Sequence, residues 1–196
     1  MKVAIVVGTR PQIIKMAPVL RAAAAHPNVT PMLWHTGQHY SFEMDRQMFD
    51  DLALPEPDHN VEVGSGSHAV QTAAIMTRLE KLMMQEKPDV VLVQGDTNTV
   101  LGASLVATKL HIPLGHVEAG LRSYDRSMPE EVNRVLTDRV SDLLLTPSED
   151  ARPNLLQEGI PGERIRFVGN VMIDTLYGML DRAAQAGLPR RLGLDD

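Results

Sequence analysis

The sequence HVEAGLRS at residues 116–123 ends a short apolar stretch, residues 112–117, with a histidine, a carboxylate, a glycine and an arginine in close succession. A strand that is buried in a sheet does not require such a polar end. In an extended strand, His116 and Glu118 point to the same side. Because open parallel sheets bind ligands at the carboxyl ends of their strands, this stretch predicts both a buried parallel strand and a site at its end.

Three other apolar stretches end in a similar way. They run into GTRP at residues 8–11, TGQH at residues 36–39 and QGDTN at residues 94–98. Strand-like stretches alternate with helix-like stretches along the chain, which is typical of βα units around a parallel sheet. We therefore predict an α/β fold with a doubly wound, Rossmann-like and mostly parallel sheet, whose four polar strand ends form one crevice.

The composition limits the class of protein. The chain has 196 residues, a net charge of -6 and no cysteine, which argues against a general nucleic-acid surface, a disulfide framework and a thiolate metal site. No segment has the apolar length of a membrane span, and the first residues lack the features of a signal peptide, so we expect a cytoplasmic protein. Residues 1–185 predict one domain, and residues 186–196 are rich in linker residues that predict the start of a hinge.

The turn at residues 8–11 places Arg10, and Lys15 after it, near the start of a predicted helix. Helix N-termini attract anions and arginine binds phosphate through two hydrogen bonds, so a phosphate or diphosphate is the expected ligand. The turn has neither the G-x-G-x-x-G fingerprint nor the P-loop pattern, so NAD and ATP are not indicated. The alternative is a tight structural turn followed by two solvated cations.

Three carboxylates are candidates for catalysis, and each has a structural alternative. Asp96 is at a strand end, but the stretch at residues 95–98 that contains it could simply cap the next helix. Glu118 would need a cationic partner at the mouth of a buried sheet, which could make it a structural ion pair. Glu130 follows Ser127 by three residues, which matches a capping box. The cations that could pair with Glu118 are Arg10, Lys15 and Arg122.

Taken in order, these motifs resemble the non-hydrolysing UDP-N-acetylglucosamine 2-epimerase family of bacteria and archaea. The resemblance covers the whole chain, and the joint order of the motifs is highly specific although each motif alone is weak. The matching segments are residues 8–11, 36–39, 95–98, 116–122, 129–131 with 133–134, and 169–170 with 173–174.

The resemblance implies a two-domain architecture like that of GT-B glycosyltransferases, with the active site between two Rossmann-like halves. This chain resembles the N-terminal half, and a second domain would supply most of the uridine and diphosphate contacts and a catalytic histidine. The implied reaction inverts C2 of the sugar by anti-elimination of UDP to 2-acetamidoglucal and re-addition of UDP to the other face. The family acts in surface polysaccharide biosynthesis, uses no metal and no redox cofactor, and commonly forms homodimers.

By this resemblance, Asp96, Glu118 and Glu130 match the family's three functional carboxylates. Arg10 and Lys15 match its diphosphate-side cations. These residue types suit the reaction, because removal of the C2 proton requires a positioned base and the oxocarbenium-like charge requires nearby carboxylates.

Two further sets of residues are assigned from the same resemblance. We predict that His116 and Arg122 bind substrate. Gln38, His39 and Gln47 lie in the region where some relatives bind a second, allosteric UDP-N-acetylglucosamine, and we name them as candidates for such a site.

The sequence departs from the better-known members at two places. Gln12 stands where they have glutamate, and the loop from Tyr124 to Met128 is shorter than theirs. Both features resemble a branch with archaeal members and epimerases of diacetamido-uronic acid sugar nucleotides, which is the alternative substrate class. Two other hypotheses are a hydrolysing relative that releases free ManNAc and UDP, and a non-catalytic half-protein or binding fragment. We expect the 196-residue chain alone to be inactive.

Overall fold

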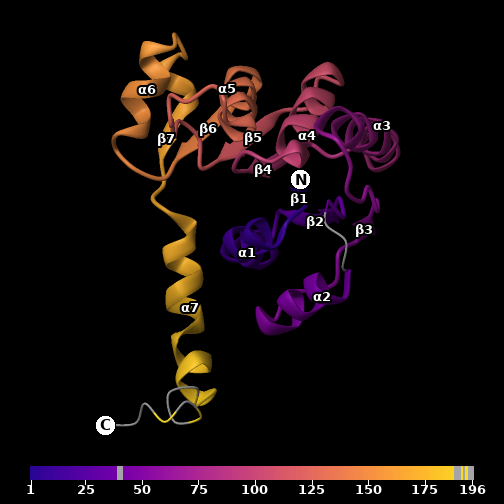
Figure 1. Ribbon diagram of the computed structural model, residues 1–196, viewed down its shortest axis with the longest axis vertical. Coiled ribbons are helices and arrows are strands. Elements are labelled where there is room, and N and C mark those ends of the chain that lie inside the picture. The colour runs from indigo at the N-terminus through magenta and orange to yellow at the C-terminus, as the bar shows by residue number, and fades with distance from the viewer. Residues whose placement is uncertain (39–41, 188–190, 192, 194–196) are drawn as a thin grey trace.

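The computed structural model describes residues 1–38, 42–187, 191 and 193, of which residues 42–45 are described by their backbone alone. Within these residues, seven strands form one sheet in the order β3-β2-β1-β4-β5-β6-β7 (Figure 1). Every strand pair is parallel, which confirms the predicted doubly wound, Rossmann-like sheet. The strands are β1 Lys2–Val7, β2 Thr30–His35, β3 His59–Asn60, β4 Val90–Gln94, β5 Leu114–Val117, β6 Leu143–Thr146 and β7 Ile165–Phe167.

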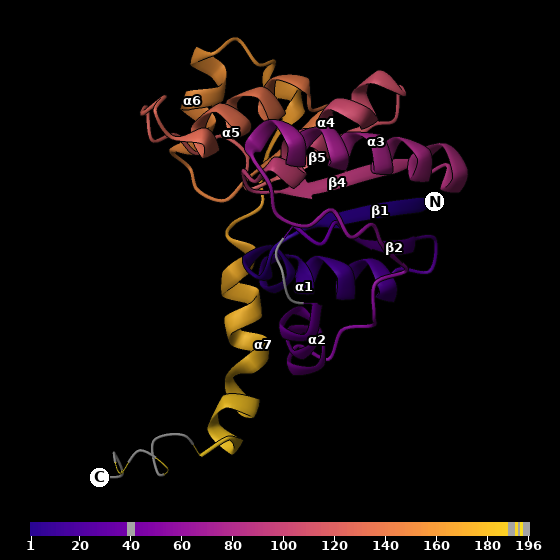
Figure 2. The same cartoon turned by 45° about the vertical axis from the view of Figure 1, so that its right-hand side comes forward.

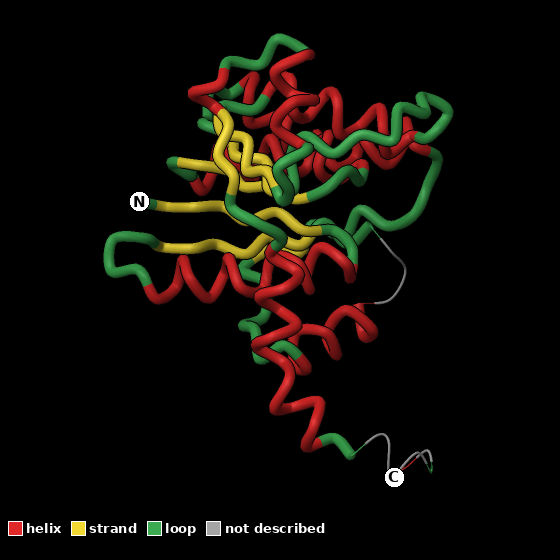
Figure 3. The backbone as a smooth tube through the Cα atoms, turned by 90° about the vertical axis from the view of Figure 1, so that its left-hand side faces the viewer, coloured by secondary structure: helices red, strands yellow, loops and turns green. Residues whose placement is uncertain are grey.

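Helices cover both faces of the sheet (Figures 2 and 3). One face packs on α3 and α4 through a core that includes Trp34, Ile75 and Val100. The other face packs on α1 and α2 through a core that includes Ile13 and Phe49. The helices are α1 Arg10–Ala25, α2 Phe42–Asp51, α3 His68–Glu86, α4 Asn98–Lys109, α5 Pro129–Val140, α6 Ala151–Gln157 and α7 Val171–Gln185, with a 3₁₀ turn at Gly162–Arg164.

The last helix, α7, returns to the start of the chain. It packs against α1, where the Thr175 hydroxyl donates to the Ile14 carbonyl at 2.8 Å, and it then extends away from the sheet (Figure 1). Among the described residues, no helix is long and apolar enough to cross a membrane.

The strand order explains where a ligand can bind. The chain moves outward from β1 to β2 and β3 on one side, and then places β4, β5, β6 and β7 on the other side of β1. The loops that follow β1 and β4 therefore leave the sheet in opposite directions and separate above its carboxyl edge. Such a switch point is the general ligand-binding crevice of open α/β sheets.

Gly8, at the end of β1, is the tightest position in this region. A Cβ atom there would lie 2.2 Å from Thr99 Oγ1 and 2.3 Å from Thr36 Oγ1, and these two hydroxyls hydrogen-bond each other at 2.7 Å. We expect Gly8→Ala to lower the free energy of unfolding by about 1–3 kcal/mol through overpacking. Urea unfolding measures this change.

A solvent-exposed glycine, Gly178, provides the matched control for Gly8. Gly178 is exposed within α7, and the nearest atom to a Cβ there is the flexible Arg21 Nη1 at 3.7 Å. Because alanine favours a helix interior over glycine, Gly178→Ala is expected to raise the free energy of unfolding by about 0.5–1 kcal/mol. Equal effects of the two substitutions would contradict the packing argument.

Candidate functional site

A polar cleft lies at the switch point between the ends of β1 and β4. Its volume is about 170 Å³. Three of the predicted site residues, Lys15, Asp96 and Glu118, come together in it. The full lining is Thr9, Pro11, Gln12, Lys15, Gln94, Gly95, Asp96, Thr97 and Glu118.

Glu118 and Lys15 form an ion pair inside this cleft. Lys15 Nζ lies 2.9 Å from Glu118 Oε1 and 2.7 Å from Oε2, and the two side chains remain 20% and 21% exposed. The pair is therefore accessible to a ligand. Of the three cations that the sequence offered as partners of Glu118, Lys15 is the one that makes this contact.

A second contact, with Gln94, also fixes the Glu118 side chain. Gln94, at the end of β4, donates its amide to Glu118 Oε2. The backbone of Glu118 has a φ of 73°, which is uncommon for a residue with a side chain and is frequent at functional sites. The strand therefore turns abruptly at Glu118 and directs its carboxylate into the cleft.

Asp96 lies on the facing loop and is held by α5. Its carboxylate forms an ion pair with Arg134, and its carbonyl accepts a hydrogen bond from Asn133 Nδ2 at 2.9 Å. The cap of α4 is Thr97, whose hydroxyl accepts from the Val100 N–H. The stretch at residues 95–98 thus does cap α4, through Thr97, while the Asp96 carboxylate lines the cleft.

Gln12 connects the two loops of the cleft. Its Oε1 accepts the Gly8 N–H at 2.9 Å, and its Nε2 donates to the Gln94 carbonyl at 2.7 Å. A glutamate could accept the first bond but could not donate the second without a proton. We did not predict Gln12 or Gln94 as site residues. The signal for Gln94 was a polar side chain at the end of an apolar strand, directly before a glycine.

Arg10 and Glu130 do not line the cleft. Both residues are exposed, Arg10 at the first position of α1 and Glu130 in the first turn of α5. The capping box offered for Glu130 is wrong, because the cap of α5 is Met128. Ser127 instead donates its hydroxyl to Asp125 at 2.7 Å.

Glu131, the neighbour of Glu130, has a structural role. It is buried, and its carboxylate accepts the N–H groups of Ser123 at 3.0 Å and Tyr124 at 2.9 Å. Burial alone would raise the pKa of Glu131, but these backbone hydrogen bonds outweigh it and lower the pKa. Glu131 therefore remains ionised and fixes the loop that follows β5.

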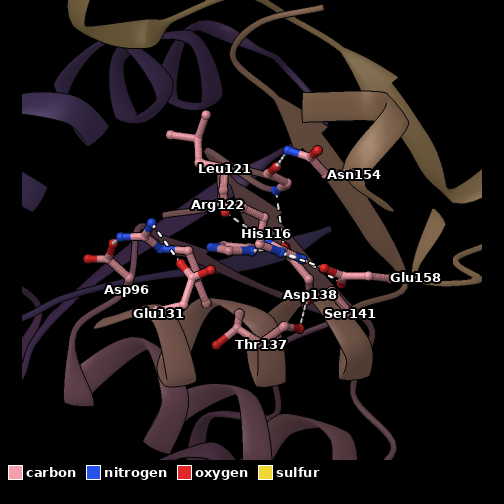
Figure 4. A network of polar contacts seen from close by, with 12 residues as sticks. Asp96, His116, Leu121, Arg122, Glu131, Thr137, Asp138, Ser141, Asn154 and Glu158 are labelled. Atoms are coloured by element: carbon pink, nitrogen blue, oxygen red, sulfur yellow. Dashed lines mark hydrogen bonds and ion pairs between the residues drawn. The ribbon is translucent and has the colours of Figure 1, made fainter. Parts of the chain in front are cut away.

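His116 and Arg122 belong to a buried polar network around Asp138. The side chains of His116 and Asp138 are fully buried, and that of Arg122 is 1% exposed. His116 Nδ1 lies 2.6 Å from Asp138 Oδ1, and its Nε2 lies 2.7 Å from the Gly95 carbonyl oxygen. Arg122 binds Asp138 and Glu158, each at 2.7 Å (Figure 4). Both side chains are thus engaged within the protein, and their contact with substrate stays a prediction.

The buried charges of this group stabilise one another. Burial alone would raise the pKa of Asp138, but the neighbouring His116 and Arg122 outweigh it and lower the pKa. Burial alone would lower the pKa of Arg122, but hydrogen bonds to Glu158 and the charge of Asp138 raise it. Asp138 and Arg122 therefore stay ionised.

Two of the three candidate allosteric residues, Gln38 and Gln47, lie in the described part of the chain. Gln38 is buried, and its Oε1 accepts the Thr99 hydroxyl at 2.8 Å. Gln47 is exposed on α2. His39 lies outside the described residues. Within the described ranges, no group of three or more histidines, cysteines or acidic residues is arranged to hold a metal ion.

The fold and the charged cleft at its switch point define a Rossmann-like α/β domain with a polar ligand site. The same fold occurs in a lipopolysaccharide outer core galactosyltransferase, with a TM-score of 0.61 at 15% identity over 86% of this chain. A family model described as UDP-N-acetylglucosamine 2-epimerase matches residues 21–192, and the chain belongs to that family.

Several proteins with the names of such epimerases are similar to this chain over most of its length. The UDP-N-acetylglucosamine 2-epimerase of Methanocaldococcus jannaschii is 53% identical over 174 residues, which are 89% of this chain and 47% of that protein. Its structure in complex with UDP-GlcNAc and UDP superimposes with a TM-score of 0.93, covering 98% of this chain and 53% of that one. A UDP-2,3-diacetamido-2,3-dideoxy-D-glucuronate 2-epimerase of Pseudomonas aeruginosa is 40% identical over 93% of this chain and 52% of its own length. The chain thus spans about half the length of the curated relatives it matches.

Proposed function

We propose that this chain is the N-terminal half of a UDP-N-acetylglucosamine 2-epimerase that interconverts UDP-GlcNAc and UDP-ManNAc. The observation that carries the proposal is the meeting of Lys15, Glu118 and Asp96 in one cleft at the switch point. The relative solved with UDP-GlcNAc and UDP shares this fold at a TM-score of 0.93. Residues 1–185 would form the N-terminal domain and residues 186–196 the start of the link to a second one.

The proposed reaction needs a proton acceptor and a counter-charge within reach of C1 and C2 of the sugar. A base takes the C2 proton as the C1–O bond breaks and UDP leaves, giving 2-acetamidoglucal. The return of UDP and of a proton to the other face completes the inversion. Glu118 and Asp96 are the carboxylates in the cleft, and proton transfer by such positioned groups contributes about 10²- to 10⁴-fold to a rate. Lys15 has three donors, so it can bind a diphosphate oxygen beside Glu118.

The exposed residues Arg10 and Glu130 remain proposed site residues. Arg10 begins α1 next to the cleft residues Thr9 and Pro11. Glu130 lies on the helix that holds Asp96 through Arg134. We propose that both act on a substrate enclosed by a second domain. The assembled protein would be a cytoplasmic homodimer that supplies a sugar nucleotide for surface polysaccharides.

A second candidate substrate is a UDP-diacetamido-uronic acid sugar. The observation that favours it is the 40% identity to the Pseudomonas aeruginosa diacetamido-glucuronate epimerase over 93% of the chain. UDP-GlcNAc remains the first candidate because the Methanocaldococcus relative, at 53%, is nearer in sequence.

We expect the 196-residue chain alone to give no measurable epimerisation, since the resemblance assigns most uridine and diphosphate contacts to a second domain. A fusion of residues 1–187 to the C-terminal half of the Methanocaldococcus jannaschii relative, here called the two-domain fusion, is expected to be active. The measurement is incubation with UDP-GlcNAc in deuterated water, followed by mass spectrometry for deuterium at C2 and for UDP-ManNAc.

Product analysis separates the possible outcomes. Release of free ManNAc and UDP would indicate a hydrolysing enzyme. Absence of label with UDP-GlcNAc but label with the diacetamido-uronate would select the second substrate. Absence of label with both would contradict the proposed function, and turnover by the isolated chain would contradict the need for a second domain.

A further inference from the structure

We propose that Asp138 is a positioning residue, whose carboxylate holds the Gly120 N–H after Glu118 and the His116 imidazole before it and, through His116, the turn before Asp96. The inference rests on the proposed function, which makes Glu118 and Asp96 the acid–base groups. Asp138 is on α5 and its side chain is fully buried. It therefore acts through other residues and does not contact a substrate itself.

The first part of the argument is the position of Glu118 between two contacts of one carboxylate. Asp138 Oδ1 lies 2.6 Å from Nδ1 of His116, two residues before Glu118. Asp138 Oδ2 accepts the N–H of Gly120, two residues after it, at 3.1 Å. Glu118 has a φ of 73° and Gly120 a φ of 83°. A backbone in this uncommon conformation is kept only where its surroundings fix it. Asp138 holds the residue on one side through the His116 side chain and the residue on the other through the Gly120 N–H.

The second part is the link from His116 to the facing loop. His116 Nε2 lies 2.7 Å from the Gly95 carbonyl. Because a carbonyl oxygen only accepts, Nε2 must carry a proton and donate it. Gly95 has a φ of 80° and directly precedes Asp96. The imidazole thus sets the distance between the two loops that carry the catalytic carboxylates.

The third part is the positive charge of Arg122, which keeps Asp138 ionised and therefore able to accept hydrogen bonds. Arg122 Nη1 donates to Asp138 Oδ2 at 2.7 Å, and Arg122 is itself held by Glu158 through two hydrogen bonds of 2.7 Å (Figure 4). Besides this ion pair, the Asp138 carboxylate contacts the Gly120 N–H and the His116 imidazole, and an ion pair that served stability alone would not require these two contacts. This chain of contacts reaches the backbone beside Glu118 directly and the turn before Asp96 through His116.

Amide hydrogen exchange on the 196-residue chain tests the proposal without turnover. The reporters are the N–H groups of Glu118, which donates to the Leu145 carbonyl, and of Gly95, which donates to the Val117 carbonyl. Neither N–H binds Asp138. Loss of global stability would speed all slowly exchanging amides by one factor, for which Val91 is the reference. In Asp138→Asn, we expect exchange at Glu118 and Gly95 to rise at least about tenfold more than at Val91.

Asp142→Asn is the matched control. Asp142 Oδ2 accepts the Leu114 N–H at 3.0 Å, at the opposite end of β5 from the site. This substitution makes the same chemical change to a carboxylate that holds the same strand. We expect Asp142→Asn to change the exchange rates at Glu118 and Gly95 by the same factor as the rate at Val91.

Turnover of the two-domain fusion provides the second readout. A misplacement of about 1 Å costs about 10²-fold in rate, so we expect Asp138→Asn to lower kcat by about that factor with little change in KM. Asp142→Asn should stay within about twofold of the parent, as surface changes away from a site generally do.

If Asp138→Asn does not fold, two substitutions of His116 test its two contacts one at a time. His116→Gln places an amide near Nε2 and can keep the bond to Gly95, while His116→Asn places one near Nδ1 and can keep the bond to Asp138. We expect His116→Gln to retain a higher kcat than His116→Asn.

The proposal is overturned if the exchange rates at Glu118 and Gly95 change only by the same factor as the rate at Val91, or if kcat of the folded variants is unchanged. An inactive parent fusion would count against the proposed function alone, because the exchange experiment is independent of it.

Discussion

Glu118→Gln is expected to lower kcat of the two-domain fusion by about 10²- to 10⁴-fold, the usual contribution of a positioned acid–base group. The amide has nearly the same shape as the carboxylate and can still accept from Lys15, so the fold should be retained. It cannot take a proton from C2 or return one. The measurements are kcat and KM for UDP-GlcNAc and deuterium incorporation at C2.

Glu86→Gln is the control for Glu118→Gln. The Glu86 side chain is 23% exposed, against 21% for Glu118, and it also pairs with a potential cation, His59 at 3.4 Å. It lies at the end of α3, outside the cleft. We expect kcat to remain within about twofold, since such a surface change is usually worth within about 0.5 kcal/mol. If both substitutions had the same effect, or if Glu118→Gln kept full turnover, Glu118 would not be an acid–base group.

The fold was predictable because its signals are local. Apolar strands with polar ends alternate with helical patterns, and this alternation alone indicates a parallel sheet. The crevice followed from the sequence in part. The ends of β1, β4 and β5 line it, whereas the described residues 36–38 at the end of β2 do not. Lys15, Asp96 and Glu118 were therefore found together as expected.

The roles of individual polar residues were less predictable because they depend on tertiary contacts. His116 and Arg122 belong to a motif at a strand end, and nothing local indicates that Asp138 on α5 engages both. The same limit explains the wrong capping box. Ser127 and Glu130 have the right spacing, but a nearby Asp125 binds the serine hydroxyl instead. Competition between nearby partners decides such contacts, and spacing does not record it.

Arg122→Met is expected to lower the free energy of unfolding by about 3–5 kcal/mol at neutral pH, because removing one partner leaves a buried charge without compensation. The methionine fills much of the same volume but gives no hydrogen bond to Asp138, which is fully buried, or to Glu158. Of the two side chains that contact the Asp138 carboxylate in the network, His116 alone would remain. Urea unfolding at pH 7 measures the loss.

The pH dependence of this loss distinguishes a charge effect from a packing effect. The pKa of Asp138 is lowered in the folded chain below its ordinary value of 3.8, so its ionised form stabilises the fold above that value and the contribution disappears as the pH falls through the lower, folded pKa. In Arg122→Met, the pKa of Asp138 should rise, because a cation is lost. The difference in stability between parent and variant should therefore be largest at neutral pH and shrink under acid conditions.

Arg126→Met, which removes an exposed arginine from the same loop, should change stability by less than about 0.5 kcal/mol at any pH. A loss in Arg122→Met that stayed constant down to strongly acidic pH would assign the effect to packing of the side chain and not to its charge.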